Sequence, residues 1–283
     1  HPELIPELPK DAIALEWGYE ADHPFDEDGA RFAAAGIPFY VCPGTSTWNT
    51  LVGRTDNATG NLLNAAENGL KHGAIGYLNT DWGDNGHWQY LPFSYLGFGY
   101  GAAVSWCLDA NRDLDIARAI SLHAFRDAPR TGTLGRIAFD LGNAHQELHL
   151  QLHNSIALFR VMQTPLKKIP EEFYGLTPDA LKRTQRAIDR AMRPLKQAIS
   201  SHPDAKLITA EFESAVAFLH HGARRALLAF EKNPAKARAL KRELARDLPR
   251  LIKEYRRLWH ARNRPGGFKE SVALLEKLRK EYE

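Results

Sequence analysis

The chain contains 283 residues, of which 44% are hydrophobic and 25% are charged, and these proportions are typical of a globular protein with a substantial core. Lys and Arg number 37 and Asp and Glu number 34, which gives a formal net charge of +3. Because both signs are mixed along the chain, the charge gives no indication of a nucleic acid or an anionic membrane as a partner.

The cysteines and the hydropathy of the chain indicate the cellular compartment of the protein. Cys42 and Cys107 stand among apolar residues and lack the spacing of metal ligands, so we expect reduced, buried thiols in a cytoplasmic protein. The sequence contains no long uncharged apolar segment and no signal sequence, so no membrane partner is expected. The chain begins with His1 rather than Met, which leaves open whether another segment precedes it.

The first 110 residues alternate short apolar runs with helical patterns. These runs are too hydrophobic to be solvated on either face, which is typical of parallel strands covered by helices. The expected order is β-α-β-α-β-α, with strands at 12–17, 38–42 and 74–79 and helices near 28–35, 57–71 and 94–110.

Aromatic and polar side chains follow each of these strands at its C-terminal end. In a (β/α) barrel the catalytic face is built at that end of the strands. We therefore interpret residues 1–110 as a partial TIM-type barrel formed by its last three βα units; an open doubly wound sheet is the alternative. The residues after the three strands are, in order, Trp17, Tyr19 and Glu20; Thr45, Ser46 and Trp48; and Asp81, Trp82 and Asp84.

The third strand ends in the segment AIGYLNTDWGDNGHWQY at 74–90. Its Gly, Asn and Asp residues cannot continue an aliphatic strand, so the chain turns there. Indole faces stack on the C–H surfaces of sugars, and carboxylates accept hydrogen bonds from hydroxyls. The segment therefore predicts a carbohydrate site, and the alternative is a polar turn whose tryptophans seal the edge of a core. The residues concerned are Asp81, Trp82, Asp84, His87 and Trp88.

From residue 111 onward the pattern changes to charged amphipathic helices, in which apolar residues recur at helical spacing. We therefore expect an α-helical domain over 111–283. Within it, His145, His149 and His153 lie four residues apart and would share one helix face. That spacing could hold zinc, but the Glu of a metalloprotease helix is missing. We interpret the histidines as an interface or core stripe, and no metal or cofactor is expected.

Two of these stretches resemble a known enzyme family. The pattern EWGY at 16–19 and the segment 39–89, which includes FYVCPGTSTWNT and LNTDWGDNGHWQ, resemble the C-terminal part of the catalytic barrel in bacterial glycoside hydrolase family 20, the β-N-acetylhexosaminidases. The resemblance covers roughly residues 1–110. It implies a hydrolase of carbohydrate metabolism, a glycosidase that acts on β-linked N-acetylhexosaminides.

The resemblance also implies roles for individual residues. In family 20 the last barrel strands supply tryptophan walls for the N-acetyl group, a tyrosine that orients it, and a Trp-x-acid motif that binds sugar hydroxyls. By this resemblance Trp17 and Trp48 are walls of the pocket, and Tyr40 contacts the acetamido group. Trp82 with Asp84 matches the Trp-x-acid motif, with Asp where many members have Glu.

The chain departs from the family in its catalytic carboxylates. Family 20 enzymes use an adjacent Asp-Glu pair, in which Glu protonates the leaving oxygen and Asp orients the substrate's acetamido group. No such pair follows a strand here, and the acids at 26–28 belong to a helix start, where acids are expected anyway. If the chain is active alone, its carboxylates must come from Asp81, Asp84 and a neighbouring Glu16 or Glu20.

Three βα units cannot close a barrel, so an apolar strip along the strands would face water. We expect this strip to be covered by self-association, with two copies related by a two-fold axis as the simplest form. A separate N-terminal segment that completes the barrel is the alternative.

Two functional hypotheses fit these features. The first is a glycoside hydrolase that acts on β-linked N-acetylhexosaminides and is completed by oligomerisation. The second is a non-catalytic fragment that binds carbohydrate or serves as a scaffold, in which the tryptophan-lined pocket is present without catalysis. Both hypotheses predict that a saccharide binds, and only the first predicts that it is hydrolysed.

Overall fold

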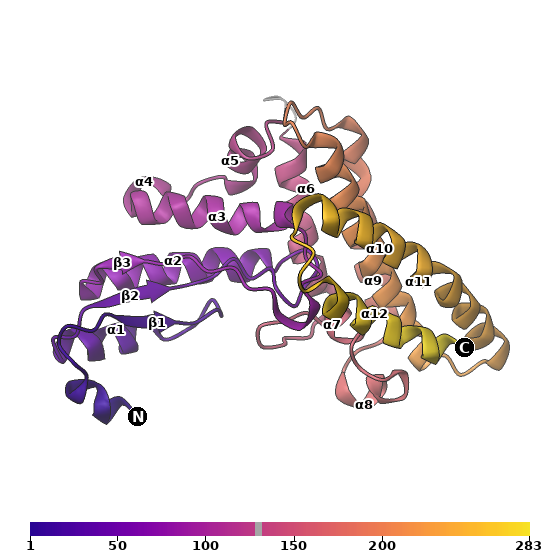
Figure 1. Ribbon diagram of the computed structural model, residues 1–283, viewed down its shortest axis with the longest axis horizontal. Helices are drawn as coiled ribbons and strands as arrows, with labels where there is room; N and C mark the ends of the chain where they lie inside the picture. The colour runs from indigo at the N-terminus through magenta and orange to yellow at the C-terminus, as the bar shows by residue number, and fades with distance from the viewer. Residues whose placement is uncertain (128–131) are drawn as a thin grey trace.

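The computed structural model describes residues 1–127 and 132–283, and its N-terminal part contains a three-stranded parallel sheet. The strands lie side by side in chain order, and each is followed by a helix (Figure 1). The predicted β-α-β-α-β-α order and the α/β class are therefore confirmed. The elements are a 3₁₀ turn η1 (Pro2–Glu7), β1 (Ala14–Trp17), α1 (Phe25–Ala34), β2 (Phe39–Cys42), α2 (Thr55–His72), β3 (Gly76–Tyr77), the 3₁₀ turn η2 (Asp84–Gly86), α3 (Leu91–Trp106) and α4 (Leu108–Asn111).

One face of the sheet is covered by helices α1 and α2. Phe39 and Val41 of β2 pack there with Phe25 of α1 and Ala65 of α2, and all four side chains are buried. Because side chains alternate along a strand, the residues between them point to the other face. Glycine at position 69 lets α2 approach the sheet closely, since a Cβ there would come within 3.0 Å of the Val41 side chain.

The other face of the sheet is open. Leu15 of β1 lies opposite Tyr40, and Trp17 lies opposite Cys42. Leu15 is 54% exposed and Trp17 is 63% exposed, and Leu78, just after β3, is 43% exposed. The apolar strip expected from the sequence is thus present. Exposed apolar side chains that lie together on one face are rare in a folded protein and commonly mark an interaction site.

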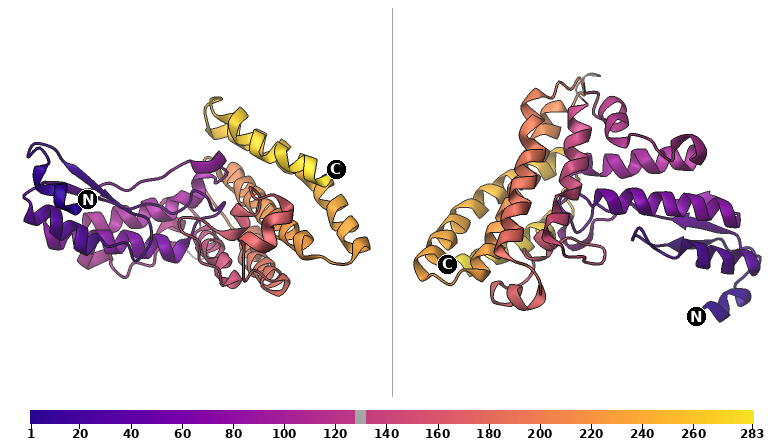
Figure 2. Two further views of the ribbon diagram at one scale, coloured as in Figure 1. Left: turned by 90° about the horizontal axis from the view of Figure 1, so that it is seen from below. Right: turned by 180° about the vertical axis from the view of Figure 1, so that it is seen from behind.

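The rest of the chain is helical in its described part. These helices pack as a bundle against the end of the sheet region, and the two chain termini lie at opposite ends of an elongated molecule (Figures 1 and 2). The elements are α5 (Ile116–His123), α6 (Thr133–Asn143), η3 (Ala144–Leu148), α7 (Ala157–Arg160), η4 (Leu166–Lys168), α8 (Ile169–Glu172), α9 (Pro178–Met192), η5 (Arg193–Gln197), α10 (Ala205–Phe230), α11 (Pro234–Arg262) and α12 (Phe268–Tyr282).

One apolar core runs across the boundary expected near residue 110. Trp88 packs on Phe159 of α7 with ring centroids 5.2 Å apart, and Phe93 of α3 packs on Phe212 of α10 at 4.7 Å. These side chains belong to a single cluster of buried residues that extends to the last helix. The helical part and the sheet region therefore stabilise each other.

Two local expectations are wrong. The predicted helix over 144–154 ends at Leu148, and His149 adopts a left-handed φ of 53°, so the three histidines do not share one helix face. Contacts with the sheet region redirect this stretch, since Ser155 donates a hydrogen bond of 2.9 Å to the backbone oxygen of Asn49. Cys42 is buried as expected, whereas Cys107 is exposed.

Among the residues that the structure describes, no helix combines sufficient length with sufficient apolar character to cross a bilayer.

Candidate functional site

A cluster of aromatic rings lies at the C-terminal ends of the strands. Tyr19, in the loop after β1, is at its centre, with ring centroids 5.7 Å from Trp17, 4.9 Å from Trp48 and 6.5 Å from Trp82. The indole nitrogen of Trp82 donates a hydrogen bond of 2.8 Å to the Tyr19 hydroxyl. Trp48 is buried, but Trp82 is 48% exposed. The strand ends thus present a half-exposed aromatic surface, which we call the aromatic cluster.

Gly44 makes the inner part of this cluster possible. A Cβ at position 44 would lie 2.5 Å from the Trp48 ring and 3.0 Å from the Tyr19 ring. These distances are too short for a real Cβ, so only glycine lets both rings pack against the backbone after β2.

Asp84 contributes charge to the aromatic cluster. Burial raises the pKa of the Tyr19 hydroxyl above its usual value, and the nearby Asp84 carboxylate adds to this rise. Tyr19 is therefore neutral at physiological pH and can both donate and accept a hydrogen bond. Asp84 itself is exposed, so its oxygens are free to meet a ligand from solvent.

Asp81 is held in place by three hydroxyl groups. Its Oδ1 accepts hydrogen bonds from Thr45 at 2.6 Å and from Thr47 at 2.8 Å, and its Oδ2 accepts one from Ser94 at 2.9 Å. All three donors are buried, whereas Asp81 is exposed. The three buried hydroxyls thus fix the carboxylate, and Oδ2, which accepts only one of these bonds, keeps a lone pair for a further donor. This arrangement preorganises Asp81 as an acceptor for hydroxyl groups.

The loop that carries Asp84 is clamped by the helical part of the chain. Asn85, Gly86 and His87 all have positive φ angles, of 51°, 109° and 50°. Consecutive left-handed residues are costly and persist only when their surroundings hold them. Here the Tyr255 hydroxyl of α11 lies 3.2 Å from the backbone oxygens of Gly86 and His87, and Gln163 donates to the Asn85 oxygen at 2.8 Å.

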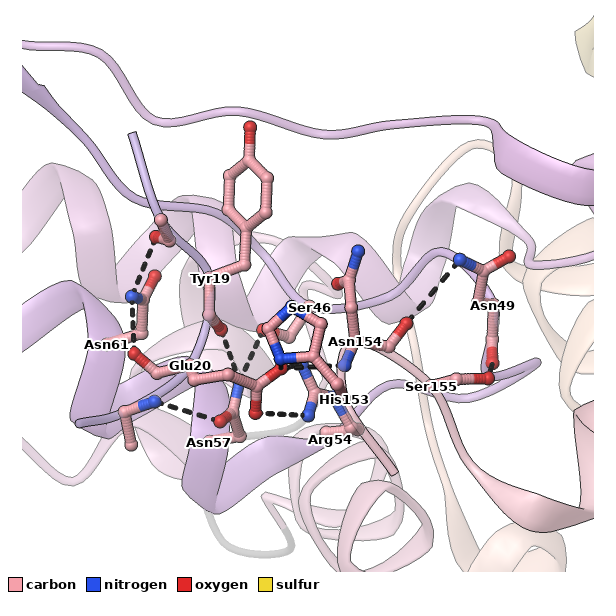
Figure 3. A network of polar contacts seen from close by, with 12 residues as sticks. Tyr19, Glu20, Ser46, Asn49, Arg54, Asn57, Asn61, His153, Asn154 and Ser155 are labelled. Carbon is pink, nitrogen blue, oxygen red and sulfur yellow. Dashed lines mark hydrogen bonds and ion pairs between the residues drawn. The ribbon is translucent and has the colours of Figure 1, made fainter. Parts of the chain in front are cut away.

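Asparagines on one side of helix α2 hold the loop that carries Tyr19. Asn61 is fully buried, donates to the backbone oxygens of Gly18 and Glu20 at 2.9 Å each, and accepts a bond of 3.0 Å from the Gly44 amide. One turn earlier, Asn57 donates to the Tyr19 oxygen at 2.7 Å and to the Ser46 hydroxyl at 2.9 Å. The asparagines therefore fix the loops after β1 and β2 relative to each other (Figure 3).

Glu20 anchors a third segment to the same region. Its two oxygens accept hydrogen bonds of 2.8 Å and 2.9 Å from the Arg54 guanidinium, and one also accepts the Asn154 amide at 2.7 Å. Figure 3 shows this pair beneath the backbone of Tyr19, whose ring points away from it. Burial alone would raise the pKa of Glu20, but the hydrogen bonds and charge of Arg54 outweigh burial and hold the pKa below its usual value.

A polar hollow of about 930 Å³ lies beside the Glu20–Arg54 pair. Its walls come from the loop after β1, the start of α2 and the stretch 145–155, and they include His145, His149 and His153. The three histidines thus line one hollow although they do not form a helix stripe. Burial lowers the pKa of His145 to about 4, so this side chain is neutral at physiological pH.

The structure separates the residues that the sequence grouped into one site. Trp17, Trp48 and Trp82 meet around Tyr19, with Asp84 nearby. Tyr40 lies on the open face of the sheet, where its ring covers Gly76 so closely that a Cβ would lie 2.4 Å away.

Two predicted binding residues pack against the helical part of the chain rather than in the aromatic cluster. Trp88 is fully buried and its indole nitrogen lies 3.3 Å from the backbone oxygen of Ser271, so it seals the core and cannot stack on a sugar. His87 packs edge-on against Trp259 of α11 at 5.7 Å. Burial lowers the pKa of His87, which keeps it neutral. Both residues join the loop to the helices.

Glu16 points away from the aromatic cluster. It lies opposite Val41 in the strand register, on the face that α1 and α2 cover. Its Oε1 lies 2.7 Å from Nε2 of His23. The expected pairing of Glu16 with Asp81 or Asp84 is therefore not formed, because strand alternation places Glu16 and Trp17 on opposite faces of the sheet.

Several residues that build the site can be recognised only weakly from the sequence. The asparagines at 57, 61 and 64 recur at helical spacing, which indicates that they share one face of the helix. The sequence gives less indication for Thr45, Thr47 and Ser94, because their common partner Asp81 is distant in the chain from the two threonines. Among the described residues, neither Asp81 nor Asp84 belongs to a group of His, Cys, Asp or Glu that could share a metal ion.

Comparisons with known proteins give no family for this chain: none of the protein-family models matches it, and no curated protein matches it.

Proposed function

We propose that the aromatic cluster binds β-linked N-acetylhexosaminides and that the chain is a glycoside hydrolase-type protein. The observation that carries this proposal is the exposure of Trp17 and Trp82, at 63% and 48%. Both rings contact Tyr19, Trp17 through its ring and Trp82 through a hydrogen bond, although they face solvent. An exposed indole pair beside acceptor carboxylates suits the apolar C–H surface and the polar hydroxyl groups of a sugar ring.

The carboxylates fit the hydroxyl groups of such a ligand. Asp81 is held by three buried hydroxyls and Asp84 is exposed beside Tyr19. Both can accept hydrogen bonds from sugar hydroxyls without giving up a protein cation. The position of the cluster at the C-terminal strand ends agrees with the last units of a (β/α) barrel, the fold that the resemblance to family 20 implies.

A hydrolase also needs a proton donor at the glycosidic oxygen. Acids that do this work at neutral pH are commonly buried among apolar groups, whereas both carboxylates of the cluster are exposed. We therefore propose that hydrolysis depends on a group from outside this site, supplied by a second copy or by an N-terminal segment. This exposure also favours a second candidate function, which is carbohydrate binding without turnover.

Binding and turnover together test the proposal. Isothermal titration of the purified chain with N,N′-diacetylchitobiose should show one saturable site, and Asp84→Asn should weaken binding about tenfold, which corresponds to about 1.4 kcal/mol for a lost charged acceptor. Aryl β-N-acetylglucosaminides report hydrolysis in parallel. Binding with turnover supports the hydrolase completed by a second copy. Binding alone excludes that form of the hydrolase and favours the second candidate, and no saccharide binding contradicts both.

A further inference from the structure

A second cluster of chemical groups lies behind the sheet, on the side opposite the aromatic cluster. Its first member is Glu16, whose side chain is only 5% exposed between β1 and α1. One carboxylate oxygen lies 2.7 Å from Nε2 of His23. The other oxygen, Oε2, is buried and has no hydrogen-bond partner within the described part of the chain.

Asp28 completes the cluster from helix α1. One ligand atom of each residue, Glu16, His23 and Asp28, lies within 4.8 Å of the other two. Asp28 also forms an ion pair of 2.5 Å with Arg31, which is itself substantially exposed. Among the described residues, no Lys or Arg forms an ion pair with Glu16. Two carboxylates thus converge on one imidazole.

The imidazole of His23 is fixed in orientation. A Cβ at Gly18 would lie 2.1 Å from its Nδ1, so the ring fills the space that the glycine leaves. Phe25 packs edge-on against the same ring at 4.6 Å. A ring held on two sides presents its Nε2 to the carboxylates without further loss of rotamer freedom.

These groups match the requirements of a transition-metal ion. A buried carboxylate oxygen without a partner is costly, and a cation between two carboxylates removes both this cost and their mutual repulsion. Imidazole and carboxylate together suit zinc, whereas magnesium and calcium prefer oxygen ligands alone. We propose that Glu16, His23 and Asp28 bind a divalent first-row transition-metal ion, with zinc as the best fit.

The proposed ion would lie next to the loop that carries part of the aromatic cluster. It would tie strand β1 to helix α1 across the loop 18–24, which carries Tyr19 and Glu20. Three protein ligands leave one tetrahedral position for water. Zinc ligands at about 2.0 Å would hold His23 and Glu16 atoms roughly 3.3 Å apart, so the 2.7 Å hydrogen bond would open slightly as the ion enters.

The test uses the full chain after removal of metals with a chelator and titration with zinc sulfate. Calorimetry should show one site with 1:1 stoichiometry, and zinc should raise the midpoint of thermal unfolding. His23→Gln and Asp28→Asn, each checked for folding by circular dichroism, should weaken this site at least tenfold. Magnesium should bind at least tenfold more weakly than zinc.

The chain has 12 histidines, so the control must show that others do not provide the site. His149→Gln/His153→Gln removes the two exposed histidines of the polar hollow and should leave the 1:1 site unchanged. Zinc binding that survives in folded His23→Gln, or that is lost in His149→Gln/His153→Gln, overturns the proposal. An absence of stoichiometric zinc binding to the unsubstituted chain also overturns it.

Discussion

At the scale of single residues, the carboxylates near the strand ends differ in what surrounds them. Asp81 is held by hydroxyls, Glu20 by a guanidinium, and Glu16 by an imidazole on the far face of the sheet. Asp84 is exposed beside Tyr19. Residue type alone does not separate these roles, because each depends on partners that the fold brings from elsewhere.

Replacement of Asp81 should affect stability as well as binding. Asp81→Ala removes the common acceptor of Thr45, Thr47 and Ser94, and buried hydroxyls that lose an acceptor cost about 1–2 kcal/mol after allowance for their bonds to one another. Urea unfolding should register this loss. Asp84→Ala is the matched control and should change the unfolding free energy by less than about 0.5 kcal/mol; equal losses in both variants would contradict the described clamp.

The Glu20–Arg54 pair should make stability depend on pH in one direction. The pKa of Glu20 in the folded chain lies below the value of 4.5 that is usual for the group. Its contribution is therefore complete above that value and is lost as pH falls through the lower, folded pKa. Glu20→Gln should be destabilised relative to the unsubstituted chain at pH 7, and the gap should narrow below about pH 4.5. A gap that grows in acid would contradict the ion pair.

At the scale of elements, helix α2 positions the candidate site by hydrogen bonds rather than by apolar contacts. Its asparagines bind backbone groups of the loops after β1 and β2. Buried backbone groups require such partners, so α2 sets where Tyr19 and Trp48 lie.

Loss of the central asparagine should therefore be severe. Asn61→Ala leaves the Gly44 amide and the oxygens of Gly18 and Glu20 without this partner, and we expect a loss of about 3 kcal/mol of unfolding free energy. Asn68→Ala, two turns further along α2, removes bonds to Asn64 only among the described residues and should cost under about 1 kcal/mol. Chemical denaturation of both variants checks the difference.

The sequence predicted elements better than it predicted side-chain neighbours. Strands and helices of the first 110 residues appear in the expected order because each element is determined by the apolar pattern of its own short segment. The stretch 144–154 was predicted as a helix and ends at Leu148, because contacts with Asn49 and Glu20 redirect it. Trp88 and Trp82 look alike in the sequence, yet one is buried by α7 and the other is not.

At the scale of the whole molecule, the open face of the sheet exposes apolar residues that an association with another chain would cover. Leu15 and Leu78 leave an exposed apolar strip along the parallel strands, and Trp17 stands where this strip meets the aromatic cluster. An uncovered strip of this kind favours association, and it lies next to the aromatic cluster through Trp17.

Self-association is therefore expected in solution. Light scattering with size-exclusion chromatography at micromolar concentration should give the mass of a dimer, and Leu15→Lys should shift it toward the monomer because a charge is placed within the strip. Leu70→Lys, which replaces an apolar residue of similar exposure on α2, is the control and should leave the mass unchanged. A folded monomer of the unsubstituted chain would exclude self-association through this face.

A fluorescence titration with N,N′-diacetylchitobiose tests most directly whether the exposed aromatic surface around Tyr19 binds a saccharide. Trp82→Ala should weaken binding about tenfold, because loss of a stacking ring removes on the order of 1.4 kcal/mol. Trp106→Ala removes a tryptophan that is 88% exposed at the end of α3 and should leave the affinity unchanged. Equal affinity in the unsubstituted chain and Trp82→Ala would contradict binding at this surface.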